Sequence, residues 1–258
     1  MLRNRCNYAY YVLFCCIVLL LIPKQGQCER IQFITETLPP FSYEHNGKMQ
    51  GYNVELLSLI WKKMHIPPTR LRVQPWARSI RDFNSPTPTC IFPAALTEER
   101  KAKYRYVATP AFFEPVLISH KDMALQFDTI SKMKQSRICV LKDVGCIAAL
   151  RQLGFTHRNF DYGSTHNSNV KKFMKERAPI IGGNKASTLY IYRKLGGDPA
   201  ALQEIVKLPR TPNGFLFNDA VSDEYITSFK QAMEKLEETE LLKQLYDRHL
   251  SFNISEPH

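Results

Sequence analysis

The sequence predicts an α/β protein of two lobes, each built on a mixed, mostly parallel sheet flanked by helices. The 258 residues include 44% hydrophobic and 23% charged side chains, a globular balance that can build a sizeable core. Strand-like and helix-like segments alternate along the chain, and the alternation restarts near residue 137. Two segments, 115–121 and 207–217, are placed to carry the chain between the units and back. Such a double crossing predicts a hinge beside an inter-lobe cleft.

The first α/β unit begins with an alternating, β-branched strand at 30–35, followed by a proline-interrupted loop at 36–43. We expect Asn53 to cap a helix that extends to about His65, because apolar residues recur there at helical spacing. The remaining elements are a strand at 70–73, a helix at 77–83, a strand at 89–93, a helical turn capped by Thr97 and a strand at 115–120.

The second α/β unit begins with a strand at 137–141 and a helix that runs from Gly145 to Leu153. Ser222 is expected to cap a final helical region at 224–250, interrupted near Thr239, whose apolar stripe is typical of core packing. Between them we expect a helix at 168–176, a strand at 179–181, a helix at 186–195 and strands at 205–208 and 214–218.

These elements predict a domain organisation in which lobe 1 is discontinuous. Residues 29–118 and 213–258 form lobe 1, and residues 119–212 form lobe 2.

The first 28 residues have the pattern of a secretory signal peptide. Arg3 and Arg5 precede an apolar run at 12–23, and small residues stand at the −3 and −1 positions of a cleavage site after Cys28. The apolar run is shorter than the ~20 residues of a comfortable membrane span, which disfavours an uncleaved anchor. The polar residues before Cys28 disfavour its lipidation. We therefore expect export to the periplasm.

The net charge of +11 excludes no soluble class by itself, but its distribution is informative. Beyond the leader, 32 Lys and Arg stand against 24 Asp and Glu, and the excess of +8 is spread along the chain. A nucleic-acid binder would show a basic stripe or a recognised motif, and neither is present. The excess forms either a soluble basic surface or a field that attracts anionic solutes.

Three of the seven cysteines, Cys90, Cys139 and Cys146, lie beyond the leader. Cys90 and Cys139 stand in apolar, strand-like runs and are interpreted as small buried hydrophobes. A Cys139–Cys146 disulfide is the alternative, which is disfavoured because one residue is mid-strand and the other lies past the following turn. No metal-ligand spacing is present, and we expect no cofactor.

Four segments, 36–64, 74–83, 92–112 and 229–250, follow one another in a family-specific order. They contain a P-P-F loop before a helix, a P-W-x-R motif, a T-x-x-R turn and a closing helix pair. In these features the chain resembles the periplasmic solute-binding proteins of the polar amino-acid type (solute-binding family 3, P-W-x-R subgroup). The resemblance implies a type II periplasmic-binding-protein-like clamshell that is monomeric and non-enzymatic. Its ligand would be a small polar or anionic solute, and its partner an inner-membrane permease of an ABC transporter or a receptor.

Arg100 is the first candidate for a ligand-binding residue. A guanidinium offers a rigid fork that pairs with a carboxylate, and Arg100 follows Thr97 by three residues at the start of a helix. The resemblance implies that this arginine holds the carboxylate of the ligand. The alternative is a solvated arginine within an E-E-R-K run.

The resemblance implies further ligand-binding residues, several of which have structural alternatives. Phe41 and Tyr43 would form an aromatic wall, although Phe41 could instead pack in the lobe core. Glu36 could face the ligand or water, and Trp76 could belong to the core. The full set of candidates is Glu36, Phe41, Tyr43, Trp76, Arg78, Thr97, Arg100, Lys142 and Asn184.

Two positions depart from the family pattern. Gly183 or Asn184 stands where amino-acid binders place an acidic residue for the ammonium group, and Pro93 and Ala94–Ala95 replace hydroxyl residues before the T-x-x-R turn. A carboxylate-bearing or otherwise anionic small molecule therefore fits better than a standard amino acid.

Three other functions compete with solute binding. A dehydratase-type enzyme on the same fold would need an acid to partner Glu36, and no H-E-x-x-H, G-x-S-x-G or phosphate-binding glycine loop is present. A sensory module would bind in the same way but present its signal to a membrane receptor. A structural protein would bind no ligand. Turnover of a substrate would indicate an enzyme, and a membrane receptor as partner would indicate a sensory module. A structural protein would show no ligand-dependent change in stability.

Overall fold

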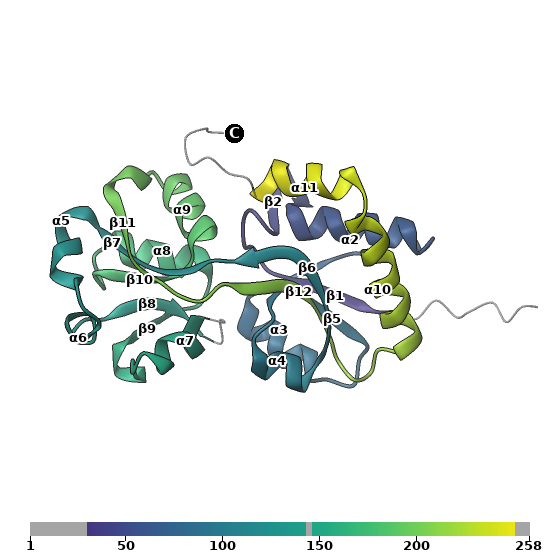
Figure 1. Cartoon of the computed structure of the whole chain (residues 1–258), viewed down its shortest axis with the longest axis horizontal. Coiled ribbons are helices and arrows are strands. Elements are labelled where there is room, and N and C mark those ends of the chain that lie inside the picture. Colours follow the sequence, from purple (N-terminus) through teal and green to yellow (C-terminus); the bar gives the residue numbers. More distant parts are fainter. Residues whose placement is uncertain (1–29, 143–145, 251–258) are drawn as a thin grey trace, which may run out of the picture.

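The computed structural model describes residues 30–142 and 146–250, so the predicted signal peptide lies outside the described residues. Two five-stranded sheets lie in the two halves of an elongated molecule (Figure 1). The first has the order β4-β1-β5-β12-β6, formed by β1 (Gln32–Thr35), β4 (Arg72–Val73), β5 (Thr89–Ala95), β6 (Arg105–Phe113) and β12 (Thr211–Phe217).

The second sheet has the order β11-β7-β10-β8-β9. Its strands are β7 (Pro115–His120), β8 (Ile138–Leu141), β9 (Phe160–Gly163), β10 (Ile180–Asn184) and β11 (Leu202–Lys207). In each sheet one strand runs against the other four, β12 in the first and β7 in the second. This arrangement confirms the predicted fold of two mixed, mostly parallel sheets flanked by helices.

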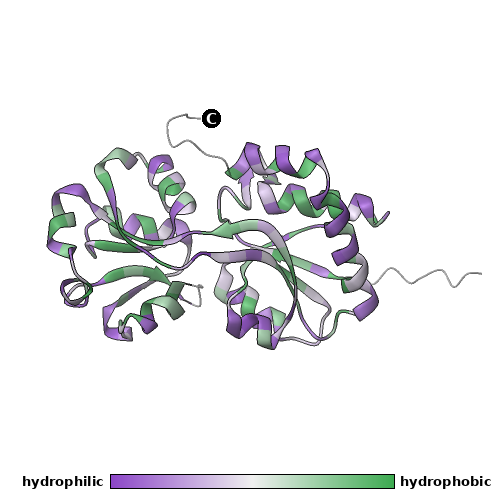
Figure 2. Ribbon diagram, viewed as in Figure 1, coloured by the Kyte–Doolittle hydropathy of each residue, from purple (hydrophilic) through white to green (hydrophobic). Residues whose placement is uncertain are grey.

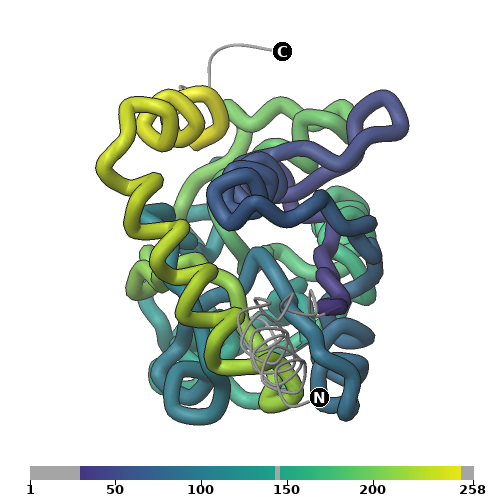
Figure 3. The backbone as a smooth tube through the Cα atoms, turned by 90° about the vertical axis from the view of Figure 1, so that its right-hand side faces the viewer, coloured from purple at the N-terminus to yellow at the C-terminus, as the bar shows by residue number. Residues whose placement is uncertain are grey.

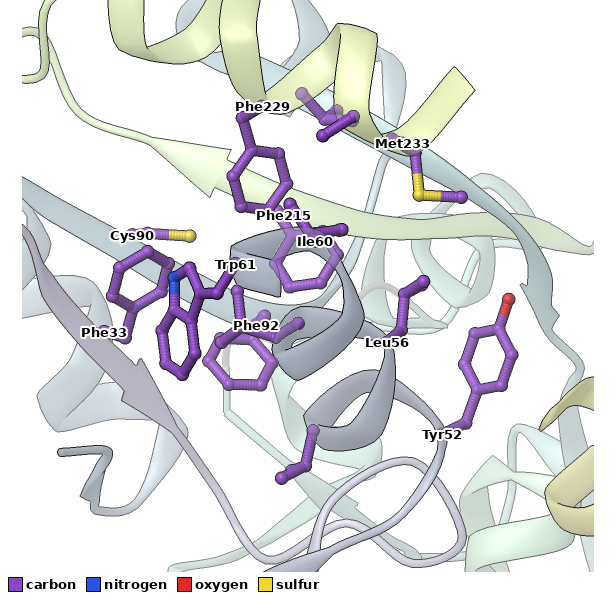
Figure 4. Packing of buried hydrophobic residues seen from close by; sticks show 14 of the residues in the cluster. Phe33, Tyr52, Leu56, Ile60, Trp61, Cys90, Phe92, Phe215, Phe229 and Met233 are labelled. Carbon is purple, nitrogen blue, oxygen red and sulfur yellow. The ribbon is translucent and has the colours of Figure 1, made fainter. Parts of the chain in front are cut away.

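Alternating side chains of the first sheet pack against helices on both faces. Phe33, Phe92 and Phe215 point to the face covered by α2 (Tyr52–Lys63), α10 (Asp223–Glu237) and α11 (Glu240–Leu250), where Trp61 and Phe229 complete the core (Figure 4). Figure 3 looks at the end of the molecule on which these three helices lie together. The opposite face carries α3 (Trp76–Phe83), beside which α4 (Glu98–Lys103) lies.

The second sheet is covered in the same way. One face packs against α8 (His166–Met174) and α9 (Lys185–Lys194), and the other against η1 (Leu125–Phe127), α6 (Ile130–Met133) and α7 (Cys146–Gln152). A helix, α5 (Lys121–Ala124), follows β7, and the 3-10 turns η2 (His157–Asn159) and η3 (Pro199–Ala201) precede β9 and β11. In Figure 2 the apolar residues gather on the strands and on the helix faces turned toward them.

The chain passes between the two sheets twice. β6 leads through Glu114 into β7, and β11 leads through residues 208–210 into β12. The two passages lie side by side, because Leu208 N donates to Pro115 O at 2.9 Å and Thr211 is paired with Phe113. The expected boundaries at 118/119 and 212/213 lie within a few residues of these passages, and the division into domains stays a prediction.

Several local predictions are confirmed. Thr97 caps α4 by accepting a hydrogen bond from Arg100 N, and Ser222 caps α10 by accepting one from Tyr225 N. The final helical region is interrupted between Glu237 and Glu240.

The expected helix cap at Asn53 is wrong. α2 begins at Tyr52 after Gly51, whose φ of 112° and close approach to the backbone of Pro40 exclude a side chain. Asn53 is fully buried, and its amide exchanges two hydrogen bonds with the amide of Asn213, at 3.1 and 2.8 Å. A buried amide pair therefore fastens α2 to β12, and the cap preference of asparagine is overridden by tertiary contacts.

A first prediction concerns Asn218, which fastens the end of β12 to the segment before β5. Its side chain, 5% exposed, accepts from Thr89 N and donates to the carbonyls of Phe83, Ser85 and Thr87. Asn218→Ala leaves these backbone groups unpaired, and we expect it to lower the free energy of unfolding by about 3 kcal/mol in urea titrations. Asn84→Ala, at an exposed position, is the control and should cost less than about 1 kcal/mol. Equal effects of the two variants would contradict this role.

A second prediction concerns the thiols of Cys90, Cys139 and Cys146, which are buried and form no disulfide. Burial raises the pKa of Cys139 to about 11 and the pKa of Cys146 to about 12. Since the thiolate is the reactive form, these groups stay protonated until the pH approaches the raised values. We expect maleimide labelling, mapped by peptide mass spectrometry at about pH 8, to miss all three residues in the native protein and to reach them after unfolding. A Cys139–Cys146 disulfide peptide would contradict the expectation.

Candidate ligand-binding cleft

A cleft that is partly open to solvent lies where the two sheets face each other across the chain passages. The first half of the molecule contributes the polar or aromatic side chains of Glu36, Trp76 and Arg100, and the second contributes His166, Asn169 and Asn184. Apolar residues such as Leu38, Phe113 and Ile181 separate them. Polar groups that converge on a largely apolar hollow are typical of small-molecule sites.

Arg100 is held at the cleft by contacts on two sides. Its Nη1 donates to Ala95 O at 2.9 Å, and its guanidinium carbon lies 4.8 Å from the ring centroid of Trp76. The backbone N of Arg100 donates to Thr97 Oγ1, so the helix cap also fixes where the side chain starts. An arginine held in this way loses little conformational freedom when its guanidinium binds an anion.

Trp76 belongs to both the core and the cleft. Its side chain is 6% exposed and packs with Ile34, Ile91 and Leu216, while its indole face carries Arg100. The two sequence interpretations of Trp76, core residue and cleft residue, are therefore combined in one side chain.

The start of α3, which presents Trp76, is fixed by Asp82. The carboxylate of Asp82 accepts from Gln74 Nε2 at 3.1 Å and pairs with Arg72 at 3.1 Å. Both contacts lower the pKa of the Asp82 carboxyl group, and the hydrogen bond from Gln74 has the larger effect.

Glu36 follows β1 and is 7% exposed, so the alternative of a carboxylate facing water is wrong. Its Oε2 lies 3.3 Å from Nε2 of His166, which belongs to the first turn of α8 in the other half of the molecule. The atoms are within ion-pair distance, but Nε2 of His166 makes no hydrogen bond to a described residue. Glu36 and His166 therefore bring the two halves together at the cleft.

Two asparagines line the second half of the cleft in different ways. Asn184 caps α9, because its Oδ1 accepts from Ser187 N at 3.1 Å and from Ser187 Oγ at 3.2 Å. Asn169 is 4% exposed, and its Nδ2 donates to Cys139 O at 3.3 Å. The Oδ1 of Asn169 is buried and has no hydrogen-bond partner among the described residues.

The other expected binding residues lie outside this cleft. Phe41 is 2% exposed and packs in the lobe core against Phe113, at 4.7 Å between ring centroids. Tyr43 lies on β2 (Tyr43–His45), which pairs with β3 (Lys48–Gln50), and its ring lies 5.8 Å from that of Tyr190 on α9. Arg78 is exposed on α3.

Thr97 and Lys142 border a second groove instead. Arg100 lines both hollows, and Lys103 and Arg151 add further cations to the groove.

His166 and Asn169 were missed by the sequence analysis. The expected helix began at Ser168, whereas α8 begins at His166 behind the N-cap Thr165. The signal was present as a hydroxyl capping pair, since Thr165 Oγ1 accepts from Ser168 N and Ser168 Oγ accepts from Thr165 N. If Thr165 is taken as the N-cap, the helix begins at His166. His166 and Asn169, which are three residues apart, then lie on one face of the helix.

Within the described ranges, no group of three or more His, Cys, Asp or Glu residues is arranged to hold a metal ion. Among the same residues, no helix combines the length and apolarity needed to cross a lipid bilayer.

The fold is similar to solved structures of binding proteins and a sensor domain. A histidine kinase sensor domain with similarity to periplasmic binding proteins has a TM-score of 0.75 at 15% identity, covering 86% of this chain and 96% of that one. The arginine-, lysine- and histidine-binding protein ArtJ from Geobacillus stearothermophilus has a TM-score of 0.71 at 14% identity, covering 87% and 96%. A histidine-bound ABC uptake transporter substrate-binding protein from Streptococcus pneumoniae has a TM-score of 0.74 at 12% identity, covering 88% and 95%.

No curated protein sequence matches the chain significantly. The family model for bacterial extracellular solute-binding proteins, family 3, matches residues 31–252 and so spans both sheets and the closing helices. The chain therefore belongs to family 3 of the bacterial extracellular solute-binding proteins.

Proposed function

We propose that the protein captures a small polar, carboxylate-bearing molecule in the cleft and delivers it to an ABC-type permease. The observation that carries this proposal is the placement of Arg100, whose guanidinium is stacked on Trp76 at the cleft wall. A positioned guanidinium in a largely apolar hollow favours a carboxylate, because the charge pair is little screened there and the fork matches both oxygens.

Binding in this proposal closes the cleft by a population shift. Arg100 and Trp76 come from the first half of the molecule, whereas Asn184 and His166 come from the second. A solute that touches both halves binds the closed form better than the open form, and its differential affinity moves the equilibrium. The paired chain passages at Pro115 and Leu208 supply the hinge.

The other candidate residues have different roles in the proposal, some in contact with the solute and some away from it. Glu36 and Asn184 contact the solute, and Thr97 orients Arg100. Phe41 supports the cleft from the core, Tyr43 holds the two halves together through Tyr190, and Lys142 and Arg78 contribute positive potential outside the cleft.

The cellular setting is also part of the proposal. The protein is exported to the periplasm through a signal peptide at 1–28, acts as a monomer and performs no catalysis. A membrane receptor in place of the permease is the alternative partner, because the fold is also similar to that of a sensor domain. Crosslinking in intact cells, followed by mass spectrometry of the attached membrane protein, identifies which partner is used.

A third prediction tests the carboxylate site. Thermal unfolding across a panel of small carboxylates, amines and sugars should show stabilisation by carboxylates, about 2.7 kcal/mol at 100 times the dissociation constant. In calorimetric titrations, Arg100→Ala should weaken the affinity for the most tightly bound carboxylate by at least about 30-fold. The reason is that truncating one partner of a buried charge pair costs roughly 2–5 kcal/mol.

Arg158→Ala is the matched control, since Arg158 is exposed in a turn away from the cleft. It should leave the affinity unchanged. Unchanged affinity in Arg100→Ala, with the melting temperature preserved, would exclude Arg100 as the carboxylate anchor. A panel in which no carboxylate stabilises the protein would argue against the proposed function itself.

A further inference from the structure

We propose that the end of the second lobe that is remote from the cleft docks on an anionic lipid surface. This remote end consists of residues 121–137, 153–161, 171–179 and 193–201. Its exposed cations face the lipid headgroups, and one exposed leucine enters the headgroup layer. The inference goes beyond the proposed function, because it assigns how the protein is held at a membrane and involves no residue of the cleft.

The sheet topology gathers these four segments at one end of the molecule. Strands β8, β9 and β10 run parallel, so their starting residues lie at one edge of the second sheet, and the antiparallel β7 ends at that same edge. The cleft is lined from the opposite edge, where β8 ends at Leu141 and β10 ends at Asn184. The segments that lead into the strands therefore lie away from the cleft, at the end where α5 and α6 are drawn in Figure 1.

Side-chain contacts join the segments into one surface. Asn159 Nδ2 donates to Lys134 O at 2.7 Å, which connects the residues before β9 to those before β8. The ring of His120 stacks on Phe173 with 4.9 Å between centroids, and the ring of Tyr192 lies 6.1 Å from each of them. The ends of β7, α8 and α9 thus meet at the same place.

Most of the positive charge of the protein is found at this remote end. Its segments contain 11 Lys and Arg against 5 Asp and Glu, an excess of +6, whereas the whole chain beyond the leader has an excess of +8. All of these cations except Lys172 are exposed. The ion pairs within the remote end are Lys132–Asp128 at 2.9 Å and Lys172–Asp161 at 2.6 Å, so most of the positive charge is not neutralised internally.

Helix stability accounts for only part of this charge. Four of the cations lie in the last turns of α8 and α9, where the helix dipole favours positive side chains. The other seven include Arg137 and Arg158, which stand shortly before strands and gain nothing from a helix C-terminus. A basic charge that is dispersed in the sequence and concentrated in space indicates an extended anionic partner.

Leu125 distinguishes a lipid surface from other anionic partners. Its side chain is 85% exposed on η1, between α5 and α6 of the remote end. A single exposed leucine is ordinary by itself, but an apolar side chain surrounded by cations matches the interface of an anionic bilayer, where charge attraction and apolar insertion act together. A nucleic acid offers no apolar layer to such a side chain. For a member of an extracellular family, the cell membrane is an extended anionic surface within reach.

Docking through the remote end leaves the cleft accessible. The first lobe, with α10 and α11 at its far side, would point away from the membrane, and the mouth of the cleft would stay in solvent (Figure 1). The protein is thereby concentrated at the membrane without obstructing solute entry.

The test measures sedimentation of the protein, recovered from cells that express the full chain, with vesicles of phosphatidylcholine alone or with about one third phosphatidylglycerol. We expect the partition coefficient to be at least about tenfold higher on the anionic vesicles at about 0.05 M salt, and this difference to disappear at about 0.5 M salt, because exposed charges are then screened.

Neutralising three exposed lysines of the remote end should lower binding to the anionic vesicles by at least about tenfold, since each lysine near such a surface contributes about fivefold. The substitutions are Lys121→Gln, Lys134→Gln and Lys175→Gln, combined in one variant. Leu125→Ser, which keeps the charge, should lower binding by about threefold.

A matched control removes the same charge from the first lobe. It combines Lys62→Gln and Lys63→Gln on α2 with Lys235→Gln on α10, all exposed, and should bind within about threefold of the wild-type protein. Equal losses in the two triple variants overturn the docking face, because binding then follows net charge alone. Equal binding of the wild-type protein to neutral and anionic vesicles also overturns it, and binding to polyglutamate but not to vesicles assigns the face to an acidic protein instead. Both triple variants should keep the wild-type melting temperature and its response to carboxylates, so the vesicle result is separate from the test of the proposed function.

Discussion

The insertion of β12 between β5 and β6 is the constraint on which the rest of the molecule depends. β12 arrives from the second sheet, runs against both neighbours and brings Phe215 and Leu216 to opposite faces of the first sheet. Without it, β6 would have no partner and the two cores of the first lobe would each lose a wall. The buried amides of Asn213 and Asn218 fix the strand to α2 and to the start of β5. Because polar groups at full burial must be satisfied in one geometry, they set the register as well as the stability.

The same constraint creates the cleft. A strand that belongs to the first sheet but follows directly from the second must cross between them beside β6 and β7, so both crossings leave from one edge of each lobe. The opposing ends, β1 with Glu36 and α8 with His166, are then held face to face without a covalent link. In the proposed function these contacts open and reform, and the hydrogen-bonded passages at Pro115 and Leu208 form the axis of that motion.

Local patterns in the sequence predicted most elements because their causes are local. Thr97 and Ser222 cap helices through hydrogen bonds that span three residues, and the break near Thr239 is set by the helix itself. The failures have non-local causes. Asparagine is a residue type that favours helix N-caps, but the side-chain amide of Asn53 is hydrogen-bonded to Asn213, which is 160 residues away along the chain.

The segments at 121–136 and β9 had no sequence expectation, because short helical turns and a four-residue strand give little periodicity to detect. The candidate site divides in the same way. Arg100 and Trp76 were predicted through a family pattern, although no local rule could show that the indole would carry the guanidinium. His166 and Asn169 were missed because they lie in the second lobe, and their approach to Glu36 depends on how the lobes meet.

The polarity of the cleft follows from which lobe supplies which charge. The first lobe carries both the arginine and the glutamate that line the cleft, Arg100 and Glu36. The second lobe adds Asn169 and His166, whose Oδ1 and Nε2 atoms have no hydrogen-bond partner among the described residues. In the proposed function, a ligand that contacts both lobes therefore stabilises the closed form. If the cleft works as proposed, capture depends chiefly on residues of the first lobe and closure on residues of the second, so substitutions in the two lobes would alter affinity and closure separately.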